Sequence, residues 1–195
     1  MSKPEKSNSD LETLYKNVLG ILNPLNLKFI LFYGSLLGYY RDGNFIEGDD
    51  DVDFMVDRND WNKLNRFLDE LKNDKISFGY RSTDFIQIFY EGIGPFDINV
   101  YDLHNDCILL KHDGNLLYKK SDIFPIKQVV YKEYLIWIPN NIEVILELTY
   151  GKNWKTPQKK YIDYEPNRIV DKLRLRGYSL PNISVKRIRP MVNKH

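Results

Sequence analysis

The stretch GSLLGYYRDGNFIEGDDDVDFMV, residues 34–56, begins with a glycine and a serine and carries four aspartates within residues 49–53. Acidic and apolar side chains alternate over residues 51–56, which is the period of a half-buried strand. This spacing predicts that Asp51 and Asp53 share one face of a strand while the apolar residues point into a core. Like charges repel at this separation, so the pattern indicates a site that holds a hard cation such as Mg²⁺.

Two other structures produce acidic clusters of this kind. In a calcium-binding EF-hand loop that begins at Asp49, the obligatory glycine position holds Phe54 and the bidentate glutamate position holds Asp60. The phenylalanine argues against this motif. A solvated acidic turn explains Asp49 and Asp50, but it leaves the alternation from residue 51 onward unexplained.

The residues before the acidic cluster have the properties of an anion site. The apolar run KFILFY, residues 28–33, predicts a buried strand that ends at Gly34. Gly34 permits close backbone approach, and the amide and hydroxyl of Ser35 would face a phosphate at the start of a helix. Arg41 can bind a phosphate bidentately, although an ion pair with Asp42 is the alternative.

A third carboxylate follows in GPFDINVYDL, residues 94–103. Asp97 lies between Phe96 and Ile98, so on a strand its side chain opposes the apolar ones and can face the first two acids across the sheet. We expect Asp97 to act as a metal ligand or as the general base for an acceptor hydroxyl. Asp102, near the end of this strand, is expected in a turn.

Apolar periodicity elsewhere predicts an α+β fold, with a mixed or antiparallel sheet flanked by helices. Residues 1–9 are expected to be a disordered tail, 10–163 one domain and 164–195 a basic C-terminal extension. Helices are predicted over 11–22, with Asp10 as the N-cap, 58–72 and 141–150, and strands over 28–33, 51–57, 76–82, 84–92, 96–103, 127–131 and 135–138.

Composition excludes several classes of protein. The net charge is +1, from 28 basic and 27 acidic residues, which does not indicate binding to nucleic acid or to an anionic membrane. The single cysteine, Cys107, rules out an intramolecular disulfide and is expected to be a buried structural thiol. No segment approaches the ~20 apolar residues of a transmembrane helix. These features predict a soluble, cytoplasmic protein.

Taken together, the motifs resemble the signature of the LicD and fukutin-related family within the nucleotidyltransferase superfold. The resemblance begins with GSLLGYYR, a spacer containing Phe-Ile, and DDDVD. It continues through GPFDINVYDL to a later run that ends in Tyr-Gly-x-x-Trp and a proline, and it spans residues 28–157. The family usually has Pro-Trp where Glu47 and Gly48 stand and a small residue where Tyr39 stands, so choline is not implied in particular.

This resemblance implies a catalytic domain that transfers a phospho-substituent, such as phosphocholine or an alditol phosphate, from a CDP-activated donor to a sugar hydroxyl of a glycan. Mg²⁺ or Mn²⁺ is the implied cofactor. Tyr150, Gly151 and Trp154 match the late motif, which is either a packed helix end or a substrate platform. The implied catalytic and metal-binding residues are Asp51, Asp53 and Asp97, with Asp49 and Trp154 in possible support, and the implied donor-phosphate ligands are Gly34, Ser35 and Arg41.

Two other functions fit the same residues. A nucleotidyltransferase would transfer a nucleoside monophosphate from a nucleoside triphosphate to a small molecule. A non-catalytic module would only bind a cation through the acids. The products of the reaction distinguish the first of these from phospho-substituent transfer, and the absence of turnover identifies the second.

Overall fold

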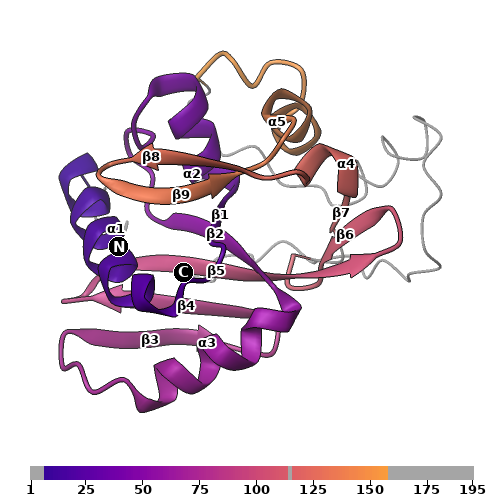
Figure 1. Ribbon diagram of the computed structural model, residues 1–195. Helices are drawn as coiled ribbons and strands as arrows, with labels where there is room; N and C mark the ends of the chain where they lie inside the picture. Colours follow the sequence, from indigo (N-terminus) through magenta and orange to yellow (C-terminus); the bar gives the residue numbers. More distant parts are fainter. Residues whose placement is uncertain (1–6, 114–115, 158–195) are drawn as a thin grey trace, which may run out of the picture.

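The computed structural model describes residues 7–113 and 116–157 of the chain. Within these residues, nine strands form one mixed sheet that is flanked by helices (Figure 1), which confirms the expected α+β fold. The strands are β1 (Ile30–Leu31), β2 (Val52–Asp57), β3 (Ile76–Arg81), β4 (Phe85–Tyr90), β5 (Ile93–His104), β6 (Cys107–Leu110), β7 (Leu116–Lys119), β8 (Lys127–Tyr131) and β9 (Tyr134–Ile138). The helices are α1 (Asn8–Leu22), α2 (Tyr33–Leu37), α3 (Arg58–Glu70), α4 (Lys120–Ile123) and α5 (Ile142–Tyr150), with a 3₁₀ turn η1 (Asn23–Leu25) and a π-helical turn η2 (Gly38–Asp42).

The order of strands across the sheet is β3-β4-β5-β2-β1-β9-β8, and β6 and β7 form a hairpin that extends from β5. Strand β2 runs parallel to β5, and β1 runs parallel to β9, whereas the other pairs are antiparallel. The parallel β2–β5 pair lies in the middle of the sheet. It therefore joins the two segments in which the sequence analysis expected the acids.

Helix α1 begins three residues before the predicted start, because Ser7 caps it. The Ser7 hydroxyl accepts a hydrogen bond from the backbone N–H of Asp10 at 3.3 Å, and the Asp10 carboxylate accepts one from the N–H of Ser7 at 3.1 Å. Such a reciprocal capping box satisfies two backbone donors at the start of a helix. The prediction of Asp10 as the N-cap was therefore wrong, and residues 8 and 9 belong to the helix and not to the tail. Residues 1–6 of that tail lie outside the described residues.

One face of the sheet is wholly apolar around β2. Val52, Phe54 and Val56 are fully buried, as the alternation predicted. The ring of Phe54 lies 5.1 Å from that of Phe96 in β5 and 6.2 Å from that of Tyr15 in α1, measured between centroids. Figure 1 shows α1 and α3 on the near side of the strands, where they cover this face. Burial of these side chains is the main force that fixes the register of β2.

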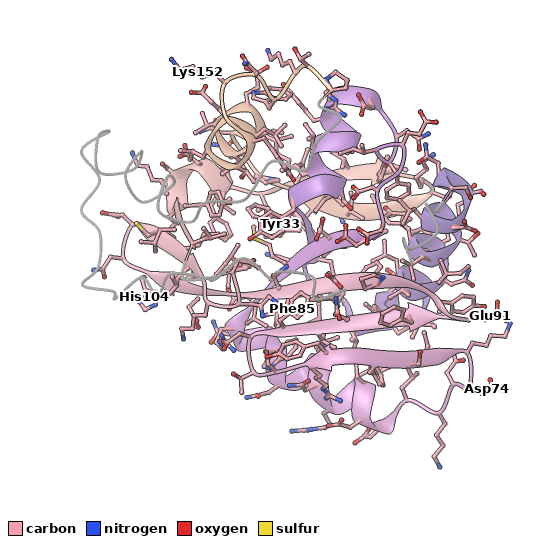
Figure 2. The ribbon with its side chains drawn as sticks, turned by 180° about the vertical axis from the view of Figure 1, so that it is seen from behind. Tyr33, Asp74, Phe85, Glu91, His104 and Lys152 are labelled. Atoms are coloured by element: carbon pink, nitrogen blue, oxygen red, sulfur yellow. The ribbon has the colours of Figure 1, made fainter. Side chains whose placement is uncertain are left out.

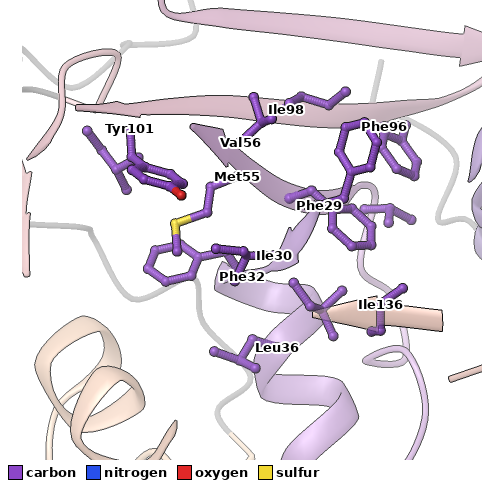
Figure 3. Close-up of a cluster of buried hydrophobic side chains, with 14 of the residues drawn as sticks. Phe29, Ile30, Phe32, Leu36, Met55, Val56, Phe96, Ile98, Tyr101 and Ile136 are labelled. Carbon is purple, nitrogen blue, oxygen red and sulfur yellow. The ribbon is translucent and has the colours of Figure 1, made fainter. Parts of the chain in front are cut away.

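The other face of β2 and β5 carries both apolar and acidic side chains. Met55 points toward Phe32 and Tyr101 in the buried cluster of Figure 3. Asp53 precedes Met55 by two residues, so it faces the same side of the sheet. The acids thus lie at the border of a packed core.

Three parts of the sequence prediction need correction. The strand expected over residues 28–33 has regular strand structure only at Ile30–Leu31, and helix α2 begins at Tyr33. Strand β5 continues to His104, so Asp102 lies within a strand and not in a turn. The β6–β7 hairpin was not predicted, although Cys107 within it is a buried free thiol as expected.

The basic extension over residues 164–195 lies outside the described residues, as do residues 158–163 of the predicted domain. None of the helices in the described part of the chain has both the length and the hydropathy needed to cross a membrane.

Candidate metal centre

The three acids singled out in the sequence come together on one face of the sheet. Asp53 of β2 and Asp97 of β5 are directly paired in the parallel ladder, and Asp51 immediately precedes β2. One carboxylate oxygen from each of these residues lies within 4.8 Å of the other two. Asp53 and Asp97 are only 7% and 8% exposed. We refer to Asp51, Asp53 and Asp97 as the acidic triad.

The electrostatics of the acidic triad are unfavourable without a counter-charge. Burial of Asp53, followed by the charges of Asp51 and Asp97, raises the pKa of its carboxyl well above the ordinary value. Asp49, in the loop before β2, contributes in the same direction. Burial also raises the pKa of Asp49 itself, to about 6. A cation among these groups would offset both the burial and the repulsion.

The donor set fits a hard divalent cation. Three converging carboxylates supply oxygen ligands, which Mg²⁺ and Mn²⁺ prefer over nitrogen and sulfur ligands. Asp51 also belongs to a second group of neighbouring carboxylates, with Asp49 and Asp50. The acidic loop and the acidic strand therefore meet at Asp51.

Gly34 and Ser35, which lie in the first turn of helix α2 and are called the glycine–serine turn, are hydrogen-bonded to Asp53 of β2. The backbone N–H of Gly34 donates to Oδ2 of Asp53 at 3.2 Å, and the Ser35 hydroxyl accepts from the N–H of Asp53 at 2.9 Å. Tyr33, just before this turn, has a φ of 41°, a left-handed conformation that costs a residue with a side chain on the order of 1 kcal/mol or more. A Cβ at position 34 would lie 2.7 Å from Oδ2 of Asp49, so any larger residue there would displace the Asp49 carboxylate.

Arg41 does not contact the acidic triad in this structure. Its guanidinium forms two hydrogen bonds to Asp42, at 2.8 and 2.7 Å, and donates to the backbone carbonyl of Trp154 at 3.4 Å. The ion pair with Asp42 is the alternative that the sequence had left open. Trp154 is itself only 6% exposed and packs near the ring of Tyr40, with 5.8 Å between centroids. Trp154 of the late motif is thus packed after the end of α5.

Two further residues lie near the triad: Asp113, which sequence reasoning missed, and Tyr150 of the late motif. Asp113, in the turn after β6, accepts a hydrogen bond of 2.5 Å from the Tyr33 hydroxyl, and its burial raises the pKa of its carboxyl. Tyr150 ends α5, and burial together with the charges of Asp53 and Asp49 raises the pKa of its hydroxyl above the ordinary value. Asp113 lies in KHDGN, which has the composition of an ordinary turn, so no pattern in the sequence distinguishes it.

Comparison with known proteins places this site within a family. The family model described as "LicD/FKTN/FKRP, nucleotidyltransferase domain" matches residues 26–141, a segment that contains the glycine–serine turn and the acidic triad. The chain is also similar to "Ribitol-5-phosphate transferase FKTN" of Homo sapiens and of Macaca fascicularis, at 26% and 25% identity over 148 residues. Each alignment covers 72% of this chain but 32% of the relative, so the chain spans about a third of the length of these proteins.

A solved structure with partial similarity is the lincosamide antibiotic adenylyltransferase LnuA with bound lincomycin. It shares 18% sequence identity at a TM-score of 0.45, over 65% of this chain and 78% of that one. At this TM-score the likeness does not bear on the site.

Proposed function

This chain belongs to the LicD/FKTN/FKRP nucleotidyltransferase-domain family, and on that premise we propose that it transfers a phospho-substituent from a CDP-activated donor to a sugar hydroxyl of a glycan. The substituent would be phosphocholine, an alditol phosphate or a similar group. The observation that carries the proposal is the convergence of Asp51, Asp53 and Asp97 inside the segment that matches the family. The similarity to proteins named ribitol-5-phosphate transferases supports the same class of reaction.

In this proposal, Asp51, Asp53 and Asp97 hold Mg²⁺ or Mn²⁺. A cation bound there supplies positive charge that neutralises the donor diphosphate and the departing nucleoside monophosphate. Asp49 supports the acids from the loop before β2. Without this charge, burial and the neighbouring carboxylates raise the pKa of Asp53, and the three acids repel one another.

The donor phosphates bind at the turn before the acids. The N–H of Gly34 and the hydroxyl of Ser35 are hydrogen-bonded to Asp53 in this structure, and Ser35 is buried, so both have to release Asp53 to bind the diphosphate beside the acidic triad. Arg41 binds the same diphosphate bidentately, for which its guanidinium has to leave Asp42.

The transfer itself is a displacement at phosphorus. The acceptor oxygen forms a bond to the phosphorus nearer the transferred group, while the bond from that phosphorus to the bridging oxygen breaks and CMP leaves with the electron pair. Asp97 takes the proton from the attacking hydroxyl. The donor, the acceptor glycan and the cytoplasmic location remain predictions.

Substitution of the acids tests this assignment. We expect Asp51→Asn and Asp53→Asn to abolish turnover, because each removes a cation ligand but keeps the size of the side chain. Asp74→Asn is the matched control, since Asp74 is exposed in the turn before β3 and lies far from Tyr33 (Figure 2). Activity would be measured with a CDP-activated donor, and circular dichroism would confirm the fold. Retained turnover in the first two variants would contradict the assignment.

Analysis of the products separates this function from its alternatives. Release of CMP together with a phospho-substituted sugar supports the proposal. Release of pyrophosphate with a nucleotidylated product would instead identify a nucleotidyltransferase. Binding of Mg²⁺ without turnover of any nucleotide-activated donor would identify a cation-binding module.

A further inference from the structure

An aromatic surface adjoins the acidic triad on the same face of the sheet. In the antiparallel pairing of β4 with β5, Gln87 lies directly opposite Asp97, so both side chains point to the same side. Phe85 and Phe89 flank Gln87 at two-residue spacing and share its face. Strand β4, which carries these residues, lies beside β5 on the side away from β2 and β1.

The rings of this surface pack on one another. Tyr80 and His112 are exposed and Phe89 is half-buried, whereas Phe85 is 5% exposed. Phe85 and His112 are stacked, with their ring centroids 3.8 Å apart and an interplanar angle of 1°. The ring of Tyr80 lies 6.1 Å from Phe85 and 5.6 Å from His112, and Tyr80 is 57% exposed. Phe85 thus supports the exposed rings of His112 and Tyr80, which present a preassembled apolar area to solvent.

Glycines on the neighbouring strands let Phe89 lie flat against the sheet. A Cβ at Gly79 of β3 would approach the Phe89 ring to 2.8 Å, and one at Gly94 of β5 would approach it to 2.9 Å. The ring of Phe89 therefore occupies the space that side chains at positions 79 and 94 would otherwise fill. We call Tyr80, Phe85, Phe89 and His112 the aromatic platform.

Gln87 connects the aromatic platform to the acidic triad. Its Oε1 accepts a hydrogen bond from the backbone N–H of Tyr80 at 3.3 Å, and its Nε2 lies 3.5 Å from Oδ2 of Asp97. The side chain is half-buried. A ring resting on the platform would thus meet a neutral amide at the edge of the catalytic acids.

The place of the platform in the strand order indicates which substrate it faces. Gly34 and Ser35 follow β1 on one side of the β2–β5 pair, whereas Phe85 lies in β4 on the other side, as Figure 2 shows for Tyr33 and Phe85. In a displacement at phosphorus, the attacking and leaving oxygens lie in line on opposite sides. With the donor phosphates at the glycine–serine turn, the acceptor approaches from the side of the platform.

We infer that the aromatic platform, with Gln87, binds a sugar ring of the acceptor glycan. Sugar rings present an apolar face that packs on aromatic rings, and their hydroxyl groups exchange hydrogen bonds with a neutral amide. The role of this sugar as the acceptor rests on the proposed function, whereas the binding of a neutral sugar ring is inferred from the platform alone.

Direct binding measurements on single variants test the inference. The probes are chitotriose, cellotriose and mannotriose, observed by saturation-transfer NMR, and CMP with Mg²⁺, observed by calorimetry. We expect Tyr80→Ala to weaken the best-bound trisaccharide about tenfold, which corresponds to ~1.4 kcal/mol, and to leave the affinity for CMP unchanged. Tyr80→Phe should retain most of the trisaccharide affinity, since it keeps the ring.

Phe78→Ala is the matched control. Phe78 is a 39% exposed aromatic residue of the same strand, but it pairs with Ile88 on the opposite face of the sheet. This variant should bind both probes as the unmodified protein does. The inference would be overturned if Tyr80→Ala and Phe78→Ala weakened trisaccharide binding equally. It would also be overturned if Tyr80→Ala lost affinity for CMP but not for the trisaccharide, or if the unmodified protein bound none of the trisaccharides. Trisaccharide binding in a protein that does not bind CMP with Mg²⁺ would support the platform while contradicting the proposed function.

Discussion

Two glycines of the GSLLG segment are required for different steric reasons. A Cβ at Gly34 would meet the Asp49 carboxylate, which can rotate, whereas a Cβ at Gly38 would lie 2.4 Å from the backbone oxygen of Asn44 and 3.0 Å from the nitrogen of Ile46. Backbone atoms cannot move aside without local rearrangement. Gly34 is therefore needed for the position of the Asp49 carboxylate, whereas Gly38 is needed for the close approach of two backbone segments.

We expect Gly34→Ala to reduce turnover strongly, because it displaces Asp49 beside the donor-binding turn, and to change the free energy of unfolding little. Gly38→Ala should instead lower the free energy of unfolding by about 1–3 kcal/mol, as overpacked sites do. Urea unfolding and a donor-turnover assay on both variants measure the two effects. Equal destabilisation by the two substitutions would show that the contact with Asp49 is as rigid as the contact with backbone.

At the scale of single residues, the sequence predicted the acidic triad because its members alternate with apolar residues. Asp53 and Asp97 each stand between two buried side chains, so the period of a strand assigns their faces. Asp113 carries no such pattern, and Tyr150 was indicated only by the resemblance of its motif to the family. They approach the site only through the packing of a turn and a helix end, which local sequence does not encode.

Among the secondary-structure elements, α3 is joined to the sheet by a network centred on Arg58, its first residue. Arg58 Nε donates to Asp102 of β5 at 2.8 Å, and a second nitrogen pairs with Asp84 before β4. Lys111 adds a further bond to Asp102 at 2.8 Å. Burial alone would raise the pKa of the Asp102 carboxyl, but the bonds from Arg58 and Lys111 outweigh burial and lower it.

A lowered pKa in the folded state means that Asp102 stabilises the fold above its unfolded pKa of 3.8 and that this contribution is lost as the pH falls through the folded value. We expect Asp102→Asn to lower the free energy of unfolding by on the order of 1 kcal/mol at pH 7. The difference from the unmodified protein should shrink toward pH 3. Urea unfolding at the two pH values measures it, and an undiminished difference at pH 3 would assign the loss to packing.

The sequence also predicted most elements but not their pairing. Alternation or length identified β2, β3, β4, β5, β8 and β9 and the three longer helices. The apolar run over residues 28–33 predicted β1, although the strand itself contains only two residues. The β6–β7 hairpin was missed because each of its strands has four residues, which is too short to show a period. These strands exist because neighbouring strands offer hydrogen-bond partners.

For the whole molecule, cation binding should couple the acidic triad to global stability. Asp51, Asp53 and Asp97 converge only in the folded chain, so a cation that binds them stabilises the fold by about 2.7 kcal/mol at 100 times its dissociation constant. We expect Mg²⁺ to raise the melting temperature and EDTA to reverse the rise.

Asp53→Asn should remove most of this shift, whereas Asp74→Asn should retain it. Differential scanning calorimetry measures both. An identical Mg²⁺ shift in the two variants would place the cation elsewhere. Adding CDP-alditols and CDP-choline to the same measurement would identify the donor, since the correct one should stabilise further only with Mg²⁺ present.

The parallel pairing of β2 with β5 has a consequence for how the protein reaches its native state. Asp53 and Asp97 become neighbours only after the chain has passed through α3, β3 and β4, and contacts of such long range form slowly. A slip of one residue between the two strands would turn Asp97 toward the apolar face. The cation site therefore forms late in folding and only when β2 and β5 pair in the correct register. A bound cation thus stabilises correctly paired chains and not those with a shifted register.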